Sequence, residues 1–292
     1  MKLMRLVAGR RSAADRGVIL TTLLMATTVA FPEGIPGIDL ANKNAFAENA
    51  GWANFAPTNG GVTVHFDGTG GYLTGCAWGE NIGWIKLGAN AGGPYANATT
   101  NNWGVNMNVV GSLSGYAWGE NVGWIKFDPL HGVVQVNMAN GQFSGVAWGE
   151  NIGWLKFSGS APDYGVRTLA FDTQPLGTPN WWLAHFGVAE AYDAGDGVPA
   201  WKKYVMDTDP TVAGSYLRIT SVSNTPSGTD VIFWPASTRR YYTLRRCDDL
   251  QAEGWNDVEG RVNVRGSGGA DSLQDASDVT QRFYRVTVEV VP

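Results

Sequence analysis

The stretch SGYAWGENVGWIKF, residues 114–127, occurs three times with small changes. The other copies read TGCAWGENIGWIKL at 74–87 and SGVAWGENIGWLKF at 144–157. Self-similarity at a spacing of about 30 to 40 residues is typical of repeat architectures that stack or close on themselves. The sequence therefore predicts a domain built from one copied unit.

Each copy is expected to form a β-hairpin. In the copy at 114–127, a three-residue loop with Gly123 in the left-handed conformation fits the order of turn-favouring residues. Gly83 and Gly153 hold the same place in the other copies. This register places Trp118 opposite Lys126.

Alternation along the two strands divides the hairpin into two faces. Ala117, Ile125 and Phe127 share one face, which is apolar and is expected to face the core. Trp118 and Trp124 lie on the other face together with an acid and a base. The second face is therefore the one whose role the sequence leaves open.

A short alternating run precedes each hairpin, at 61–66, 104–109 and 132–138, so we expect antiparallel three-stranded repeats. YGVRTLAF at 164–171 begins the same run without a hairpin, and ENAGWANF at 48–55 supplies only the last run. Unpaired strand edges invite pairing. The two fragments either close a ring within one chain or join neighbouring chains head to tail.

Two interpretations of the Trp face compete. In one, each Trp pair packs on the pair of the next repeat, because indole rings bury large areas. In the other, the rings are exposed platforms for sugar rings, since exposed Trp patches usually have a use. The candidate binding residues are Trp78, Trp84, Trp118, Trp124, Trp148, Trp154, Lys86, Lys126 and Lys156.

The composition argues against several classes of function. The formal charge of −5 does not provide the basic footprint that nucleic acids require. The three histidines show no triad or metal spacing, and the two cysteines form no metal motif. Glu80, Glu120 and Glu150 repeat identically, which is unusual for a catalytic acid. We expect no enzyme activity, cofactor or metal.

The N-terminal segment is expected to be an export signal. A basic lead at 2–16 precedes an apolar run at 17–31, which is short for a membrane span. The preferred cleavage site follows Ala47, and a second candidate follows Ala30. This places the signal peptide at 1–47 and the protein outside the cell or on its surface, with no membrane span in the mature chain.

Three further segments follow from composition. Residues 48–171 form the β-repeat domain. Residues 172–212 read as a linker with a short helix, because PLGTPN interrupts the β pattern and WWLAHFGVAEAY at 181–192 has helical spacing. Residues 213–292 hold short strand-like runs and are expected to form a small β-sandwich.

The repeat half resembles the GYAWGENIGWINF-type repeats of exported bacterial proteins, through the signatures at 76–87, 116–127 and 146–157. The tail resembles a C-terminal module of exported planctomycete and verrucomicrobial proteins, through PNWWLAHFG, GDGVPAWKKYVMDTDPT and RFYRVTV. The resemblance implies export and a modular build. It implies no chemical activity.

In such relatives the segment before TDPT looks like an Asp-rich calcium loop. If Gly197 is the invariant loop glycine, Asp196 stands at the fifth position, but Tyr192 and Ala194 stand at the first and third. Lys203 occupies the twelfth position, where calcium requires a bidentate Glu. No calcium is expected there.

Together these patterns predict an exported, non-enzymatic structural or adhesive protein of the cell surface. The alternative is a carbohydrate-binding protein that uses its repeated Trp platforms. Its partners would be polysaccharides or other surface proteins, and self-association through strand edges remains open.

Overall fold

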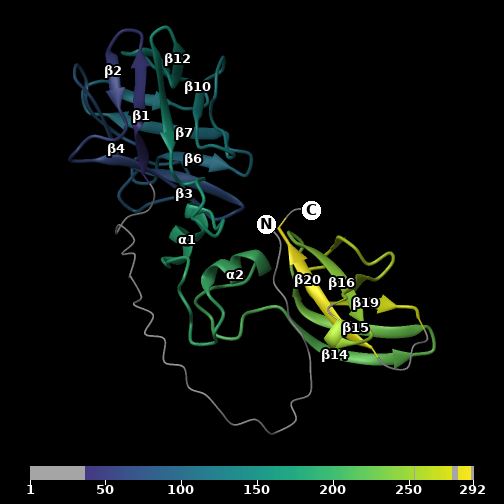
Figure 1. Ribbon diagram of the computed structural model, residues 1–292. Helices are drawn as coiled ribbons and strands as arrows, with labels where there is room; N and C mark the ends of the chain where they lie inside the picture. Colours follow the sequence, from purple (N-terminus) through teal and green to yellow (C-terminus); the bar gives the residue numbers. More distant parts are fainter. Residues whose placement is uncertain (1–36, 253, 278–281, 291–292) are drawn as a thin grey trace. The chain divides into compact units, whose positions relative to one another are not determined.

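The computed structural model describes residues 37–252, 254–277 and 282–290. The chain is mainly β, with antiparallel sheets as predicted (Figure 1). It divides after Gly187 into two compact units. The first unit holds the repeats and the second holds the C-terminal strands. The expected signal segment lies outside the described residues, apart from its last part from Gly37 onward.

The repeat unit is a closed ring of four hairpins. Each hairpin pairs with the next in chain order, and the last strand, β11, pairs back to the first, β1. The ring strands are β1 (Ile38–Ala47), β2 (Gly51–Asn54), β4 (Gly70–Gly79), β5 (Gly83–Lys86), β7 (Leu113–Gly119), β8 (Gly123–Lys126), β10 (Phe143–Gly149) and β11 (Gly153–Lys156).

A third strand joins each hairpin, so the repeats are three-stranded. β3 pairs with β4, β6 with β7, β9 with β10 and β13 with β1. The fourth repeat therefore combines both ends of the unit, and the ring closes within one chain. These strands are β3 (Gly61–Phe66), β6 (Val105–Asn108), β9 (Val134–Val136) and β13 (Asp163–Thr168), and β12 (Ser158–Ser160) pairs with β13.

The fourth hairpin changes the predicted start of the repeat domain. Phe46 pairs with Trp52 just as Trp118 pairs with Trp124, so NAFAENAGWANF at 44–55 is a complete hairpin. The sequence pattern missed it because Phe46-Ala47 replaces Trp-Gly. The domain therefore begins at Ile38 instead of residue 48, and a boundary after Ala47 would remove β1 from the ring.

The loop of each hairpin shows why Gly123 is needed and where the predicted register was wrong. Gly123 has φ 79°, in the left-handed region as expected. Gly119 pairs with Gly123, and Val122 N–H donates to the Gly119 carbonyl at 3.2 Å. Trp118 consequently lies opposite Trp124, not Lys126, because the glycine follows the turn instead of ending it.

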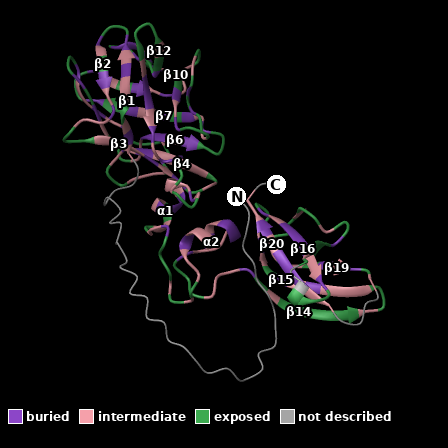
Figure 2. Ribbon diagram, in the orientation of Figure 1, coloured by how far each residue is buried: buried purple, intermediate pink, exposed green. Residues whose placement is uncertain are grey.

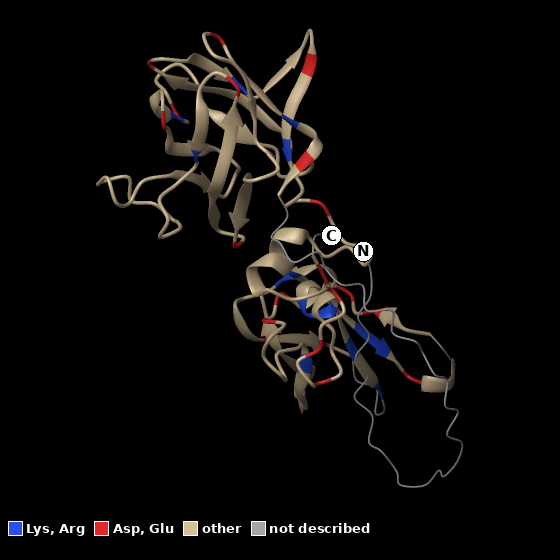
Figure 3. Cartoon of the chain, turned by 90° about the vertical axis from the view of Figure 1, so that its left-hand side faces the viewer, with Lys and Arg blue, Asp and Glu red and all other residues tan. Residues whose placement is uncertain are grey.

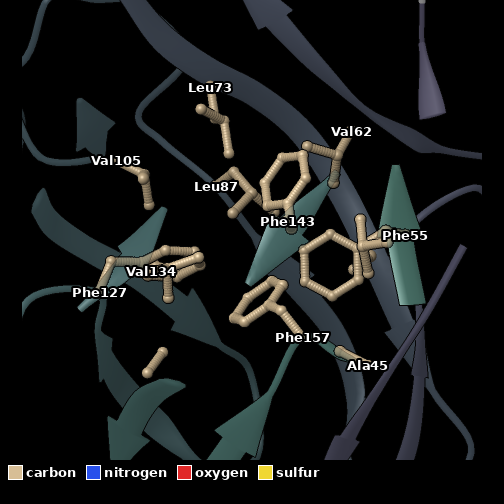
Figure 4. Packing of buried hydrophobic residues seen from close by; sticks show 14 of the residues in the cluster. Ala45, Phe55, Val62, Leu73, Leu87, Val105, Phe127, Val134, Phe143 and Phe157 are labelled. Atoms are coloured by element: carbon tan, nitrogen blue, oxygen red, sulfur yellow. The ribbon is translucent and has the colours of Figure 1, made fainter. Parts of the chain in front are cut away.

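The inward face of the ring forms the core, as the alternation predicted (Figure 4). Each long strand contributes an alanine that is fully buried, and a large side chain follows each short strand. Small and large residues thereby alternate around the ring and fill it. The alanines are Ala45, Ala77, Ala117 and Ala147, and the large side chains are Phe55, Leu87, Phe127 and Phe157. Figure 2 shows buried strand segments between exposed loops.

The predicted linker at 172–212 is divided between the two units. Helix α1 (Asn180–Phe186) packs on the repeat unit, where the Trp181 ring lies 5.1 Å from Phe66. Helix α2 (Ala200–Met206) packs Val205 into the core of the second unit. Each helix therefore belongs to a folded unit and is not part of a free linker: α1 to the repeat unit and α2 to the second unit. In the described part of the chain, no helix has both the length and the apolar character needed to span a bilayer.

The second unit contains two sheets that share one hydrophobic core. Phe233 on one sheet and Tyr242 on the other lie 5.0 Å apart between ring centroids. The first sheet consists of β14 (Arg218–Thr225), β15 (Gly228–Ala236) and β19 (Gly269–Asp275). The second consists of β16 (Tyr241–Cys247), β17 (Asn256–Asp257), β18 (Val264–Arg265) and β20 (Phe283–Glu289), with the short 3-10 helix Leu250–Ala252 between β16 and β17.

Candidate binding grooves on the repeat unit

The two Trp residues of each repeated hairpin lie side by side on its outer face. Trp118 and Trp124 meet edge to face at 4.7 Å, and each keeps 36% and 42% of its surface exposed, respectively. The same contact recurs for Trp78–Trp84 at 4.9 Å, Trp148–Trp154 at 4.8 Å and Phe46–Trp52 at 5.0 Å. The outer face is thus aromatic and half-exposed around the ring.

The neighbouring hairpin places a polar side chain, not a second Trp pair, opposite each aromatic pair: an asparagine, Asn54, opposite Trp78 and a lysine in the other three cases. Lys86 lies opposite Trp118, and Lys126 lies opposite Trp148. Lys156 lies opposite Phe46 across the seam. The interpretation in which Trp pairs pack on the pairs of the next repeat is therefore wrong: the rings pack within a hairpin, and a lysine or Asn54 separates neighbouring pairs.

The first groove lies between the second and third hairpins of the ring and has a volume of about 460 Å³. Trp84 and Lys86 come from β5, while Trp118 and Glu120 come from β7 and its loop. Cys76 contributes a half-buried thiol, and burial raises its pKa. The groove combines two indole rings, an ammonium and a carboxylate.

The second groove, of about 480 Å³, is the same site between the first and second hairpins of the ring. Trp52, Asn54 and Trp78 hold the places of Trp84, Lys86 and Trp118. The ring of Tyr164 from β13 stands 5.0 Å from Trp52 and forms a further wall. An amide therefore replaces the ammonium here.

The third groove, of about 430 Å³, forms around Trp124. Trp103 stands at 5.1 Å from it, edge to face, and Tyr116 lies at 6.0 Å. The segment 97–100 from the long loop after β5 lines the other side. Three grooves at equivalent places in the ring therefore share a Trp but differ in the neighbouring side chains.

The three lysines on the outer face of the ring, Lys86, Lys126 and Lys156, have different partners. Lys156 Nζ lies 3.1 Å from Glu48 Oε1, and Lys86 donates to Asn90. Lys126 Nζ lies over the ring of Tyr116, 5.8 Å from its centroid. Charged residues are scattered singly over the repeat unit (Figure 3), so no strong field of one sign covers the grooves.

The copied asparagine has a role that sequence reasoning missed. Asn81 Nδ2 donates to the carbonyl of Ala50 at 3.0 Å, Asn121 to Ile82 at 3.2 Å and Asn151 to Val122 at 3.1 Å. Each bond links one loop to the loop of the preceding hairpin. The identical Glu-Asn in every copy was the available signal, since a turn alone does not require Asn each time.

Both cysteines are free thiols, so the structure contains no Cys76–Cys247 bridge. Cys76 occupies the position that Tyr116 and Val146 hold in the other two copies, each opposite a lysine. That position faces outward, so the thiol lines the first groove and does not fill the core. Among the described residues, no group of three or more His, Cys, Asp or Glu side chains could hold a metal ion.

The calcium-like loop is organised around a lysine. The fully buried Lys203 ammonium lies 2.8 Å from Asp196 Oδ2 and donates to the Val212 carbonyl at 2.8 Å. Asp193 Oδ1 accepts backbone N–H bonds from 195–197. The ammonium group of Lys203 is therefore the cation that pairs with the Asp196 carboxylate of this loop.

Comparisons of the chain with models of known families, with curated proteins and with solved structures give no match.

Proposed function

We propose that the chain is an exported, non-enzymatic binding protein that holds saccharides in the grooves of its repeat unit and serves adhesion at the cell surface. The observation that supports this most is the half-exposed Trp pair repeated around the ring. Exposed indole rings in contiguous patches normally mark interaction sites. The two rings of a pair pack on each other within one hairpin and do not connect neighbouring repeats. Packing between repeats therefore does not explain why the pairs recur.

A saccharide suits the chemistry of the first groove. One face of a pyranose ring consists of C–H groups and packs on an aromatic ring, while its hydroxyls need polar partners. Trp84 and Trp118 offer the rings, and Lys86 and Glu120 offer a donor and an acceptor. Mainly apolar sites with a few placed polar groups are typical of small-ligand binding.

The repetition supports a multivalent mode of binding. Grooves on one rigid ring can engage successive units of a polymer or several chains of a glycan-coated surface, and the second contact then forms at high effective concentration. Differences such as Asn54 in the place of Lys86 give each groove its own preference. Weak single sites would therefore be sufficient for adhesion.

A glycan array probed with the full chain tests the proposal. The triple variant Trp78→Ala, Trp118→Ala, Trp148→Ala is expected to lose array binding, because one ring of each of the three Trp–Trp pairs is removed. Trp234→Ala is the matched control: Trp234 is 38% exposed, as are Trp78 and Trp148, but lies in the second unit. Circular dichroism checks the fold of each variant. Unchanged array binding by the triple variant, or no glycan bound by the wild type, would refute the proposal.

A further inference from the structure

A separate pocket lies between the β3–β4 hairpin and helix α1 of the repeat unit. It has a volume of about 480 Å³, and Asn106 and Met107 of strand β6 also line it. It shares no lining residue with the three grooves. The motifs assigned to saccharide binding therefore do not account for it.

Aromatic rings form the walls of this pocket. Trp181 from α1 meets Phe66 edge to face at 5.1 Å. On the hairpin side, the rings of His65 and Tyr72 are stacked at 4.6 Å. His65 Nε2 is within 2.8 Å of Thr74 Oγ1, and burial lowers the pKa of the ring, which keeps it neutral near neutral pH. Trp181 is half-buried, so part of its surface stays accessible.

The charge of the pocket comes from one carboxylate. Asp67 is at the turn of the hairpin, and Oδ1 accepts bonds from Thr69 N–H at 2.7 Å, Thr69 Oγ1 at 2.7 Å and Gly70 N–H at 3.0 Å. Burial alone would raise the pKa of Asp67, but these bonds and the nearby His185 hold it below its ordinary value. The carboxylate is therefore ionised at neutral pH.

The second oxygen of that carboxylate is available to a ligand. All three bonds end at Oδ1, and no donor in the described part of the chain bonds to Oδ2. The described residues that line the pocket include neither Lys nor Arg; the titratable side chains among them are Asp67, His65, Tyr72 and His185. The pocket thus disfavours anions and offers an acceptor to a cation.

We propose that this pocket binds a small organic cation, an ammonium group carried on a flat apolar body. The ammonium would donate to Asp67 Oδ2, while the body lies between Trp181 and Tyr72. Aromatic faces attract cations through their quadrupole, and a carboxylate supplies the charge-assisted hydrogen bond. The volume of the pocket is in the range usual for small-ligand sites.

Binding of phenethylammonium to the full chain tests this proposal, with 2-phenylethanol as the uncharged probe of the same shape. Saturation-transfer NMR titrations at about pH 8, where histidine is ordinarily neutral, would give both dissociation constants. The ammonium is expected to bind about tenfold or more tightly than the alcohol, because the alcohol lacks the ion pair.

Two variants locate the site. Asp67→Asn keeps an Oδ1 acceptor for Thr69 and Gly70 but removes the charge, so it is expected to weaken ammonium binding about tenfold while leaving the alcohol unchanged. Trp181→Leu is expected to weaken both probes. The triple variant of the grooves should bind the ammonium like the wild type, which separates this site from saccharide binding.

Three results would overturn the proposal: equal affinity for the two probes, undiminished binding of the ammonium by Asp67→Asn, or no saturable binding by the wild type. A thermal melt of each variant verifies that the repeat unit is folded. Loss of glycan binding in the triple variant together with retained ammonium binding would leave both proposals standing.

Discussion

Gly115 and Gly123 both adopt left-handed backbone, at φ 90° and 79°, but the space around them differs. A Cβ at Gly123 would meet no atom within 4 Å, whereas a Cβ at Gly115 would come within 2.3 Å of the Gly104 carbonyl oxygen. Gly123 is therefore needed for its backbone conformation alone. Gly115 is needed both for that conformation and for the close approach of two strands.

This difference gives the first prediction. Gly123→Ala should lower the free energy of unfolding by about 1–2 kcal/mol, the cost of a left-handed alanine. Gly115→Ala should cost more, because the strand from Gly104 must also move. Urea unfolding followed by Trp fluorescence compares the two variants. An equal cost for both would show that the close approach at Gly115 is easily relieved.

The loop asparagine gives the second prediction. Asn121→Ala removes the bond to the Ile82 carbonyl and should lower the free energy of unfolding by about 0.5–1.5 kcal/mol. The neighbouring Glu120 is exposed, so Glu120→Ala is the matched control and should change stability little. Thermal melts of both variants provide the comparison. An Asn121→Ala variant that melts like the wild type and like Glu120→Ala would mean that the asparagine bond contributes nothing.

At this scale the sequence predicted which side chains face inward, and Ala117, Ile125 and Phe127 are all buried as expected. It predicted the left-handed glycine for the same local reason. It could not predict that Trp118 faces Trp124, because a turn that ends before Gly123 and one that includes it use the same residue types. The inter-loop bond of Asn121 also depends on a neighbour that only the closed ring provides.

Among the elements, the loop before α2 depends on an internal ion pair. Burial by itself would raise the pKa of Asp196, but bonds from Lys203, Gly214 and Val198 hold it at about 2. Since this folded pKa is below the ordinary value of 3.8, the stabilisation is present above about pH 4 and is lost as the pH falls through about 2. Lys203 thus takes the role that a metal ion has in calcium loops.

The third prediction follows from this ion pair. Lys203→Met leaves the Asp196 carboxylate, whose side chain is 10% exposed, without its partner and should lower the free energy of unfolding by about 3–5 kcal/mol at neutral pH. Lys202→Met on the same helix is the control. The difference from wild type should shrink between about pH 4 and 2, as Asp196 becomes protonated in both proteins. Denaturant titrations across this range measure it; a pH-independent difference would contradict the role of the pair.

The elements with repeated signatures were predictable, and those without were not. The strands of the three full copies were expected from their alternation. Helix α2 was missed because the charged Lys203 lies on its buried face and interrupts the apolar spacing, and because Asp207 ends it at φ 58° without a glycine. The first hairpin was missed because Phe46-Ala47 departs from the Trp-Gly signature, although the pairing is the same.

For the whole molecule, the seam determines where the repeat unit must begin. β1 pairs with β2, β11 and β13 and so completes the ring. The fourth prediction is that a chain starting at residue 48 does not form a stable repeat unit, whereas one starting at residue 37 does. Near-ultraviolet circular dichroism and thermal melting of the two chains distinguish them. Equal melting would show that the ring tolerates the loss of β1 and would favour cleavage after Ala47.

The seam also sets the order in which the molecule can be made. Phe46 leaves the ribosome early but must remain without Lys156, its neighbour in the ring, until the last hairpin has been synthesised. Closing so long a segment costs conformational entropy that no local contact offsets, so the ring shuts late in folding. Until then, each partial assembly presents open strand edges that can capture a second chain. The export proposed above would therefore be easiest while the chain is still unfolded.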